Sequence, residues 1–274
     1  MMKINDIAWC PGCGNFLIRD ALEGALTELA IPPREIVLTS GIGQAAKMPQ
    51  YLKVNYFNGL HGRALPPAVG IKLARPELTV IAVSGDGCNY GEGGNHFLHT
   101  LRKNLDITIL TCNNQVYGLT KGQSSPTTDR NTANMLDPRG NENEPLNPLA
   151  VAVAVGAPFV ARGFAGEKDH LKELLKEAIR FRGTAVVDIL QPCVTFNKVN
   201  TFAYYRQRVY RLDVPGKDRR EALEIAGIWG ERIPIGVILR DETRPVREPA
   251  GRIFQNSVTS GMMEMLLRTH SSAI

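Results

Sequence analysis

Apolar runs and amphipathic segments alternate along the first two thirds of the chain. Four short apolar runs predict strands: "EIVLTSGIG" (35–43), "LTVIAVSGDG" (78–87), "DITILTCNN" (106–114) and "GTAVVDILQPC" (183–193). Apolar residues at helical spacing, or a proline-rich start, predict helices over 15–31, 64–74, 93–104 and 169–181. Because the strands are too apolar for a sheet with one solvated face, we expect an α/β fold with a doubly wound, mostly parallel sheet that helices cover on both faces.

Two regions depart from this alternation. Residues 128–148 are polar and rich in Asn and Pro, so we expect a long, functional surface loop there. After Asn197 the regular pattern fades into the segments 201–212, 218–230 and 233–240. The expected organisation is therefore a main domain over residues 1–197 and a C-terminal extension over 198–274 that packs on the core or on a partner subunit.

Composition narrows the functional class. The 274 residues carry 32 basic and 27 acidic side chains without a run of five or six like charges, so we expect anionic ligands or an acidic protein partner and no nucleic acid. No stretch approaches the length of a membrane span, and the polar start lacks a signal-peptide core, so a cytoplasmic location without membrane contact is expected. Five cysteines, two in a C-x-x-C pair, suit reduced thiols or metal ligands.

A carboxylate and a carboxamide end two successive predicted strands. Asp86 stands between glycines after the strand "LTVIAVSG", and Asn114 follows the next strand, one strand–helix–strand unit later. The carboxyl ends of parallel strands share one edge of a sheet, so these side chains can be neighbours. Their oxygens suit Mg²⁺ that keeps positions open for phosphate. An isolated Gly-Asp-Gly is more often a plain turn, but its pairing with Asn114 favours the metal site.

Several segments together resemble a known family. In order, they are "WCPGCGNF", "SGIG", "HGRALP", "GDG" with "GGNH", "YGLTKGQ", "SPTT" and "PCVTFN". They resemble the beta subunit of 2-oxoacid:ferredoxin oxidoreductases, especially the 2-oxoglutarate-type and broad-specificity two-subunit enzymes, from about Trp9 to Ile235. The fold that this resemblance implies is the pyrophosphate-binding half of a thiamine diphosphate enzyme, which agrees with the parallel sheet expected above.

The resemblance assigns roles to individual residues. Mg²⁺ would be held by the side chains of Asp86 and Asn114 and by the carbonyl of Val116. His61 would lie against the cofactor, although a lone histidine is often structural. The remaining cofactor-binding positions are Gly85, Gly87, Cys88, Asn89, Tyr117, Gly118, Leu119 and Lys121, with Cys88 and Asn89 in the loop beside the diphosphate and Lys121 on the phosphates of coenzyme A.

The implied reaction is oxidative decarboxylation of a 2-oxoacid to acyl-CoA and CO₂, with electrons passed to ferredoxin. Lys47, assisted by Arg63, would pair with the distal carboxylate of 2-oxoglutarate, which favours that substrate over pyruvate. A surface lysine is the plainer interpretation of Lys47. The glutamate that activates thiamine diphosphate would come from an alpha or fused gamma-alpha subunit, so the chain alone should be inactive.

The resemblance also implies an iron–sulfur cluster, but the sequence leaves several alternatives for this site open. Cys10, Cys13 and Cys193 match three ligands of a 4Fe-4S cluster, whereas Gln44 stands where the family commonly has the fourth cysteine. The cluster could keep a weaker fourth ligand, become a three-iron form or be absent, and zinc on the three cysteines is a further alternative. A non-oxidative decarboxylase half would also explain Gln44. A non-catalytic zinc or assembly subunit is the remaining rival.

Overall fold

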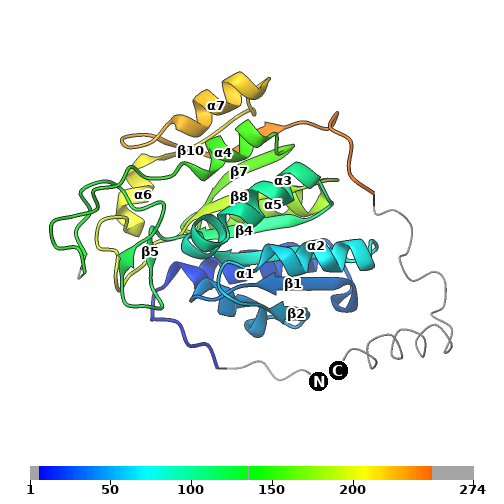
Figure 1. The fold of residues 1–274 in the computed structure, drawn as a ribbon, viewed down its shortest axis with the longest axis horizontal. Coiled ribbons are helices and arrows are strands. Elements are labelled where there is room, and N and C mark those ends of the chain that lie inside the picture. Colours follow the sequence, from blue (N-terminus) through cyan, green and yellow to red (C-terminus); the bar gives the residue numbers. More distant parts are fainter. Residues whose placement is uncertain (1–5, 135, 249–274) are drawn as a thin grey trace, which may run out of the picture.

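A computed structural model describes residues 6–134 and 136–248 and contains an eight-stranded sheet in the order β2-β1-β3-β4-β8-β7-β10-β9 (Figure 1). All neighbouring strands are parallel except β10 and β7, which are antiparallel. This arrangement confirms the expected mostly parallel α/β sheet. The strands are β1 (Ile36–Ser40), β2 (Asn55–Asn58), β3 (Thr79–Gly85), β4 (Thr108–Asn113), β7 (Phe159–Phe164), β8 (Ala185–Leu190), β9 (Val209–Arg211) and β10 (Ile233–Arg240).

Helices cover both faces of the sheet because successive residues of its central strands point to opposite sides. In β3, Ile81 and Val83 belong to the core under α1 (Gly14–Glu28) and α5 (Lys168–Arg180). Val80 and Ala82 belong to the core on the other face. That second core is covered by α2 (Leu65–Ala74), α3 (Gly94–Lys103), α4 (Pro148–Val155) and α7 (Arg219–Gly227).

The sequence pattern did not predict α4, β7 or the edge strand β2, among other elements. Residues 150–155 of α4 alternate Ala and Val, which does not distinguish a helix from a strand, and β7 begins four residues later. The helix is set by its ends: the Asn147 side chain accepts a hydrogen bond from Ala150 N (3.0 Å), and Gly156 ends it with φ 88°. The third element, β2, is a four-residue edge strand with four exposed side chains, so it lacks an apolar signature.

The segment after Asn197 packs on the core. It forms α6 (Phe202–Arg208), β9, α7 and β10, and β10 extends the main sheet by pairing with β7. The expected extension therefore contributes two strands to the sheet, and its residues 249–274 lie outside the described residues. None of the helices formed by residues 6–134 and 136–248 is long and apolar enough to cross a membrane.

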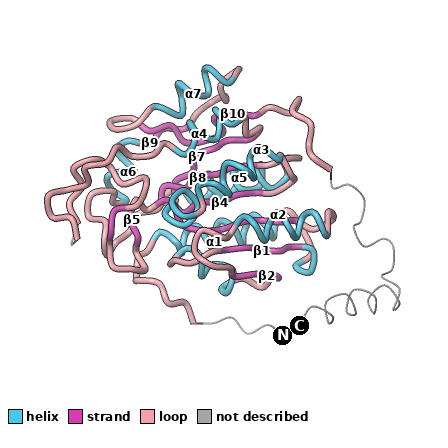
Figure 2. The backbone as a smooth tube through the Cα atoms, in the orientation of Figure 1, coloured by secondary structure: helices cyan, strands magenta, loops and turns pink. Residues whose placement is uncertain are grey.

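Loops gather at the carboxyl ends of the central strands. After β4, the chain forms the small hairpin of β5 (Val116–Tyr117) and β6 (Gln123–Ser124), and a long irregular segment then leads to α4. Figure 2 shows these loops at the left of the view, around β5. After β3, the chain instead enters η3 (Gly87–Glu92), a single π-helical turn of the kind often found at functional sites.

A close contact holds η3 against β5. A Cβ atom at Gly87 would lie 2.2 Å from the ring of Tyr117, so only glycine fits there. The Tyr117 hydroxyl donates a hydrogen bond to Glu92 Oε2 at 3.1 Å, which joins the other end of η3 to the same ring. The turn after β3 and the hairpin after β4 are therefore fixed to one another.

We expect Gly87→Ala to lower the free energy of unfolding by about 1–3 kcal/mol, because the added methyl group must displace the Tyr117 ring. Gly118→Ala is the matched control, since a Cβ there would lie 3.8 Å from its nearest neighbour. The control should stay within about 0.5 kcal/mol of the parent chain. Urea unfolding measures both values, and equal stability of the two variants would contradict the contact.

Candidate functional site

Asp86 and Asn114 lie side by side at the end of the two central strands. β3 and β4 pair in parallel with Gly85 opposite Cys112, so the residues that follow each strand enter the same space. Both side chains line one cavity of about 140 Å³. The cavity also brings together most of the predicted cofactor positions, namely His61, Gly85, Gly87, Cys88, Val116, Tyr117, Gly118 and Leu119.

The Asp86 carboxylate is almost completely buried, with an exposed fraction of 1%. Burial raises its pKa, while hydrogen bonds from Ser125 and Thr127 act in the opposite direction. Ser125 Oγ donates at 2.5 Å and Thr127 Oγ1 at 2.8 Å, and both hydroxyls approach the same oxygen, Oδ2. Backbone N–H groups of Asp86 and Gly87 also donate to the carboxylate. Neither hydroxyl contacts Oδ1.

Behind Asp86, a chain of buried polar side chains runs into the sheet. Thr127 Oγ1 lies 2.8 Å from Asn113 Oδ1 as well as from Asp86, and Asn113 Nδ2 donates to both oxygens of Asp188 at 3.2 Å. The Tyr90 hydroxyl donates to Asp188 Oδ1 at 2.8 Å. Burial raises the pKa of Asp188 to about 6 despite these hydrogen bonds. Asp86 is thus fixed by a network rather than by single contacts.

Sequence reasoning missed the members of this network other than Asp86. Thr127 comes from the "SPTT" segment, which marks the resemblance but carries no predicted role. Tyr90 and Asp188 sit inside secondary structure, where one sequence gives no sign that they meet. A polar residue at an inward-facing strand position, as Asp188 is in "AVVDIL", is the one signal that was available.

Glycines leave space along one wall of the cavity. A Cβ at Gly43 would meet no heavy atom within 4 Å, and a Cβ at Gly85 would have its nearest neighbour at 3.9 Å. Gly43 also adopts φ 133°, which favours glycine. A side chain at either position would project into open space. Because glycine has none, a ligand can approach the backbone closely along this wall.

His61 stands at the rim of the cavity in a defined setting. Its Nε2 lies 2.7 Å from Glu92 Oε2, and its Nδ1 lies 3.4 Å from the carbonyl oxygen of Ile42. The His61 and Tyr117 rings are 6.0 Å apart between centroids. Glu92 contacts both rings and was missed by the sequence analysis, because it falls in the turn between "GDG" and "GGNH". The carboxylate orients the imidazole.

Of the predicted cofactor and substrate residues, four lie outside the lining of this first cavity. Asn89 belongs to η3 rather than to an irregular loop, and its amide donates to Thr111 Oγ1 at 2.8 Å inside the core. Lys47 is half-buried on the short 3₁₀ helix η2 (Ala45–Tyr51), while Arg63 and Lys121 are exposed. Lys121 has φ 82°, a left-handed conformation that presents its side chain on a tight turn.

A second, smaller cavity contains the three predicted cluster ligands. Cys10, Cys13 and Cys193 line it together with Gln44, which also lines the first cavity. Gln44 Oε1 is buried and has no hydrogen-bond partner among the described residues. The tight loop at the C-x-x-C pair has Cys13 N donating to Cys10 O at 3.0 Å and Gly12 at φ 81°. The two remaining cysteines lie elsewhere, Cys88 in η3 and Cys112 in β4.

Two N–H groups point at sulfur atoms in this second cavity. Gln191 Nε2 donates to Cys13 Sγ and Phe196 N donates to Cys193 Sγ, both at 3.4 Å. Burial raises the pKa of the Cys13 thiol to about 11. Within residues 6–134 and 136–248, no three His, Cys, Asp or Glu side chains are grouped so that they could hold a single metal ion.

Two family models match consecutive parts of the chain. "Thiamine pyrophosphate enzyme, C-terminal TPP binding domain" matches residues 39–189, and the model of the C-terminal part of the pyruvate ferredoxin oxidoreductase beta subunit matches residues 193–256. The first match begins at β1, ends in β8 and contains both Asp86 and Asn114. The second begins at Cys193.

Individual relatives agree with these matches. The 2-oxoacid:ferredoxin oxidoreductase subunit beta of Saccharolobus solfataricus is 43% identical over 88% of this chain and 84% of its own length. The beta subunit of 2-oxoacid:ferredoxin oxidoreductase 1 of Aeropyrum pernix is 46% identical over 84% of this chain and 76% of its own length.

A solved structure extends the likeness to the whole fold. A chain of "2-oxoglutarate:ferredoxin oxidoreductase from Magnetococcus marinus with 2-oxoglutarate, coenzyme A and succinyl-CoA bound" matches with a TM-score of 0.86 and 34% sequence identity. The match covers 99% of this chain and 88% of that chain. The chain belongs to the family of 2-oxoacid:ferredoxin oxidoreductase beta subunits.

Proposed function

We propose that this chain binds thiamine diphosphate and Mg²⁺ and that, with a partner subunit, it oxidises a 2-oxoacid to acyl-CoA and CO₂ while electrons pass to ferredoxin. The observation that carries the proposal is the buried Asp86 carboxylate, which shares a glycine-walled cavity with Asn114. When bound, thiamine diphosphate supplies the chemistry that cleaves the bond to the leaving CO₂. The chain's own residues bind and orient this cofactor.

The donor set at the strand ends fits Mg²⁺. Asp86, Asn114 and Val116 all line the cavity, and they can offer carboxylate, amide and backbone carbonyl oxygens, which are the ligands that this ion prefers. Asn114 Oδ1 accepts a hydrogen bond from Val116 N at 3.2 Å, and an amide oxygen keeps a second lone pair. A cation beside Asp86 would offset the cost of burying its charge.

The cavity wall fits a diphosphate. Gly43, Gly85 and Gly118 line it, and none of them carries a side chain that would keep a ligand from the backbone. His61, oriented by Glu92, stands at the rim where the rest of the cofactor would extend. Leu119 lines the same cavity, and Lys121 on the adjacent tight turn is proposed to contact the phosphates of coenzyme A.

Substrate choice is proposed to favour 2-oxoglutarate over pyruvate. Lys47 lies on η2, one turn after Gln44 of the cavity lining, and Arg63 follows His61 by two residues. Either cation can pair with a second carboxylate, which pyruvate lacks. The protein from Mycobacterium tuberculosis named "2-oxoglutarate oxidoreductase subunit KorB" is 43% identical over 70% of this chain and 52% of its own length, which supports this choice.

Electron transfer is proposed to use an iron–sulfur cluster in the second cavity. Cys10, Cys13 and Cys193 line it, and two of these sulfur atoms receive N–H donors, an arrangement that favours thiolates bound to iron. The two cavities share Gln44, so a cluster would lie directly beside the cofactor. Gln44 in place of a cysteine is the one observation that favours the rival, a non-oxidative decarboxylase half.

The partner is proposed to supply an activating glutamate. No glutamate belongs to the lining of the first cavity in the part of the chain that the structure describes, and Glu92 is engaged by His61 and Tyr117. The rim residue Ile42 and the nearby Leu60 are exposed apolar side chains, as expected of a surface that binds another protein. An alpha or fused gamma-alpha subunit fits this role.

We expect Asp86→Ala to abolish Mg²⁺-dependent binding of thiamine diphosphate. Thr127→Val should weaken Mg²⁺ affinity by about 10–100-fold, because loss of a hydrogen bond that orients a metal-binding carboxylate typically has an effect of this size. Thr127→Ser keeps the hydroxyl and should restore the affinity. Calorimetric titration on the assembled complex measures both, with unfolding curves as the control for folding. If Asp86→Ala binds thiamine diphosphate and Mg²⁺ as tightly as the parent, Asp86 is not a ligand of the metal ion.

The cluster proposal predicts that Gln44→Cys raises iron and sulfide content per chain under anaerobic purification, because iron–sulfur clusters favour thiolate ligands. Gln44→Ala is the control for changes in side-chain size. A full, equally oxygen-stable four-iron cluster in the parent chain would mean that another group already completes the ligand set. Absence of iron from both proteins would place the electron relay outside this chain.

Obligate partnership is tested by separate purification. The chain alone should show no 2-oxoacid-dependent reduction of ferredoxin, since the cavity lacks its activating carboxylate, and addition of the partner subunit should restore turnover. The partner alone is the control. Full activity of the isolated chain would contradict this part of the proposal.

A further inference from the structure

A charged pair interrupts the apolar face of two neighbouring central strands. Arg162 of β7 and Asp188 of β8 are directly opposite each other, and each is only 3% exposed. Val160 and Val186, two residues earlier on the same face, belong to the large core under α3 and α4. Charges in such a position cost free energy unless groups of opposite charge or hydrogen bonds compensate them.

Arg162 and Asp188 attract each other electrostatically, but within the described residues each hydrogen bond to these charges involves a neutral group. The Arg162 guanidinium donates to the carbonyl oxygens of Pro234 (3.3 Å) and Ala226 (3.1 Å), while its Nε is buried and has no partner in the described chain. The Asp188 carboxylate accepts hydrogen bonds from Tyr90 and Asn113. The guanidinium therefore retains donor capacity that no atom of residues 6–134 and 136–248 uses.

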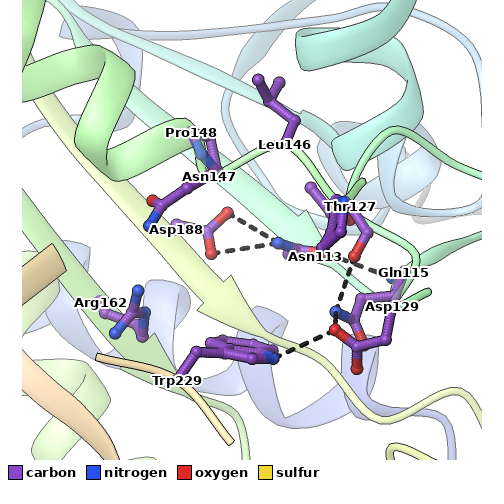
Figure 3. A pocket seen from close by; sticks show the side chains of 11 residues that line it. Asn113, Gln115, Thr127, Asp129, Leu146, Asn147, Pro148, Arg162, Asp188 and Trp229 are labelled. Carbon is purple, nitrogen blue, oxygen red and sulfur yellow. Dashed lines mark hydrogen bonds between the residues drawn. The ribbon is translucent and has the colours of Figure 1, made fainter. Parts of the chain in front are cut away.

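A cavity of about 180 Å³ opens between these two side chains (Figure 3). Trp229 forms one wall, with the Arg162 guanidinium carbon 5.5 Å from the centre of its ring. Asp129 lies further along the lining and accepts a hydrogen bond from Trp229 Nε1 at 3.1 Å. Leu146, which is 38% exposed, stands where the cavity reaches the surface.

We propose that this cavity is a binding site for a small zwitterion of the α-amino acid class. Its carboxylate would meet the unused donors of Arg162, and its ammonium group would meet Asp188 and Asp129. An anion alone would face two carboxylates, and a cation alone would leave Arg162 Nε without a partner. Trp229 and Leu146 offer apolar surface for a side chain, and the volume equals that of about six water molecules.

The cavity is separate from the proposed cofactor site but shares its supporting residues. Asn113 and Thr127 line it, and Thr127 donates to Asp86 on its other side. An occupant would therefore touch the hydrogen-bond network that holds Asp86. The binding proposal itself does not depend on the proposed function, because it rests on Arg162, Asp188 and the cavity between them.

Calorimetric titration of the full chain, assembled with its partner subunit, tests the proposal. Each common L-amino acid is titrated alone, and the tightest is compared with the acid that lacks its amino group and the amine that lacks its carboxylate. We expect one amino acid to bind in a 1:1 ratio and both truncated compounds to bind at least about tenfold more weakly. Failure of every amino acid to bind, or equal binding of either truncated compound, would overturn the proposal.

A mutation at the surface end locates the bound molecule without disturbing the buried charges. Leu146→Trp should fill the opening and weaken binding by at least about tenfold. Leu223→Trp on α7 is the matched control, since Leu223 has a similar exposed fraction (39%) and lies outside the cavity lining. The control should bind as the parent does. Parent-like binding by Leu146→Trp would show that the amino acid binds elsewhere and would refute the site.

Discussion

Burial of the Asp86 carboxylate is the constraint on which the arrangement of this molecule depends. A charge at the end of a central strand, with its pKa raised by burial, is tolerable only where hydroxyls, backbone amides or a cation face it. Ser125 and Thr127 supply the hydroxyls, which forces the segment after β6 to fold back over the strand ends. Asp86 also lines the cavity where we propose Mg²⁺ and diphosphate.

The proposed cofactor site and the proposed cluster site lie next to each other at the same edge of the sheet. The cavity at β3 and β4 and the cavity lined by Cys10, Cys13 and Cys193 meet at Gln44, so a cofactor and a redox cluster would be neighbours. The Gln44 side chain carries a buried oxygen without a partner in the described chain. A thiolate at this position would serve a cluster better. The proposed electron transfer would therefore depend at Gln44 on a residue that departs from the pattern that the resemblance implies.

The sheet and the pairing of Asp86 with Asn114 could be predicted from the sequence, because apolar period and strand ends are local signals. The supporting residues could not: Thr127 contacts Asp86 from a loop 41 positions away, and Glu92 contacts His61 from the end of the π-helical turn η3. The Ala/Val alternation likewise did not predict α4, whose helical conformation is set by its capping residues Asn147 and Gly156. Contacts of this kind form only when the chain has folded, so local sequence patterns do not predict them.

Anomalous scattering from Mn²⁺ tests the central claim most directly. Crystals of the assembled complex, grown with thiamine diphosphate and Mn²⁺ in place of Mg²⁺, should show one strong metal peak within coordination distance of Asp86, Asn114 and the Val116 carbonyl. Because Mn²⁺ accepts the same oxygen ligands as Mg²⁺, the substitution preserves the chemistry of the site. A diphosphate whose metal ion is bound by other residues, or a cavity that holds neither, would contradict the account.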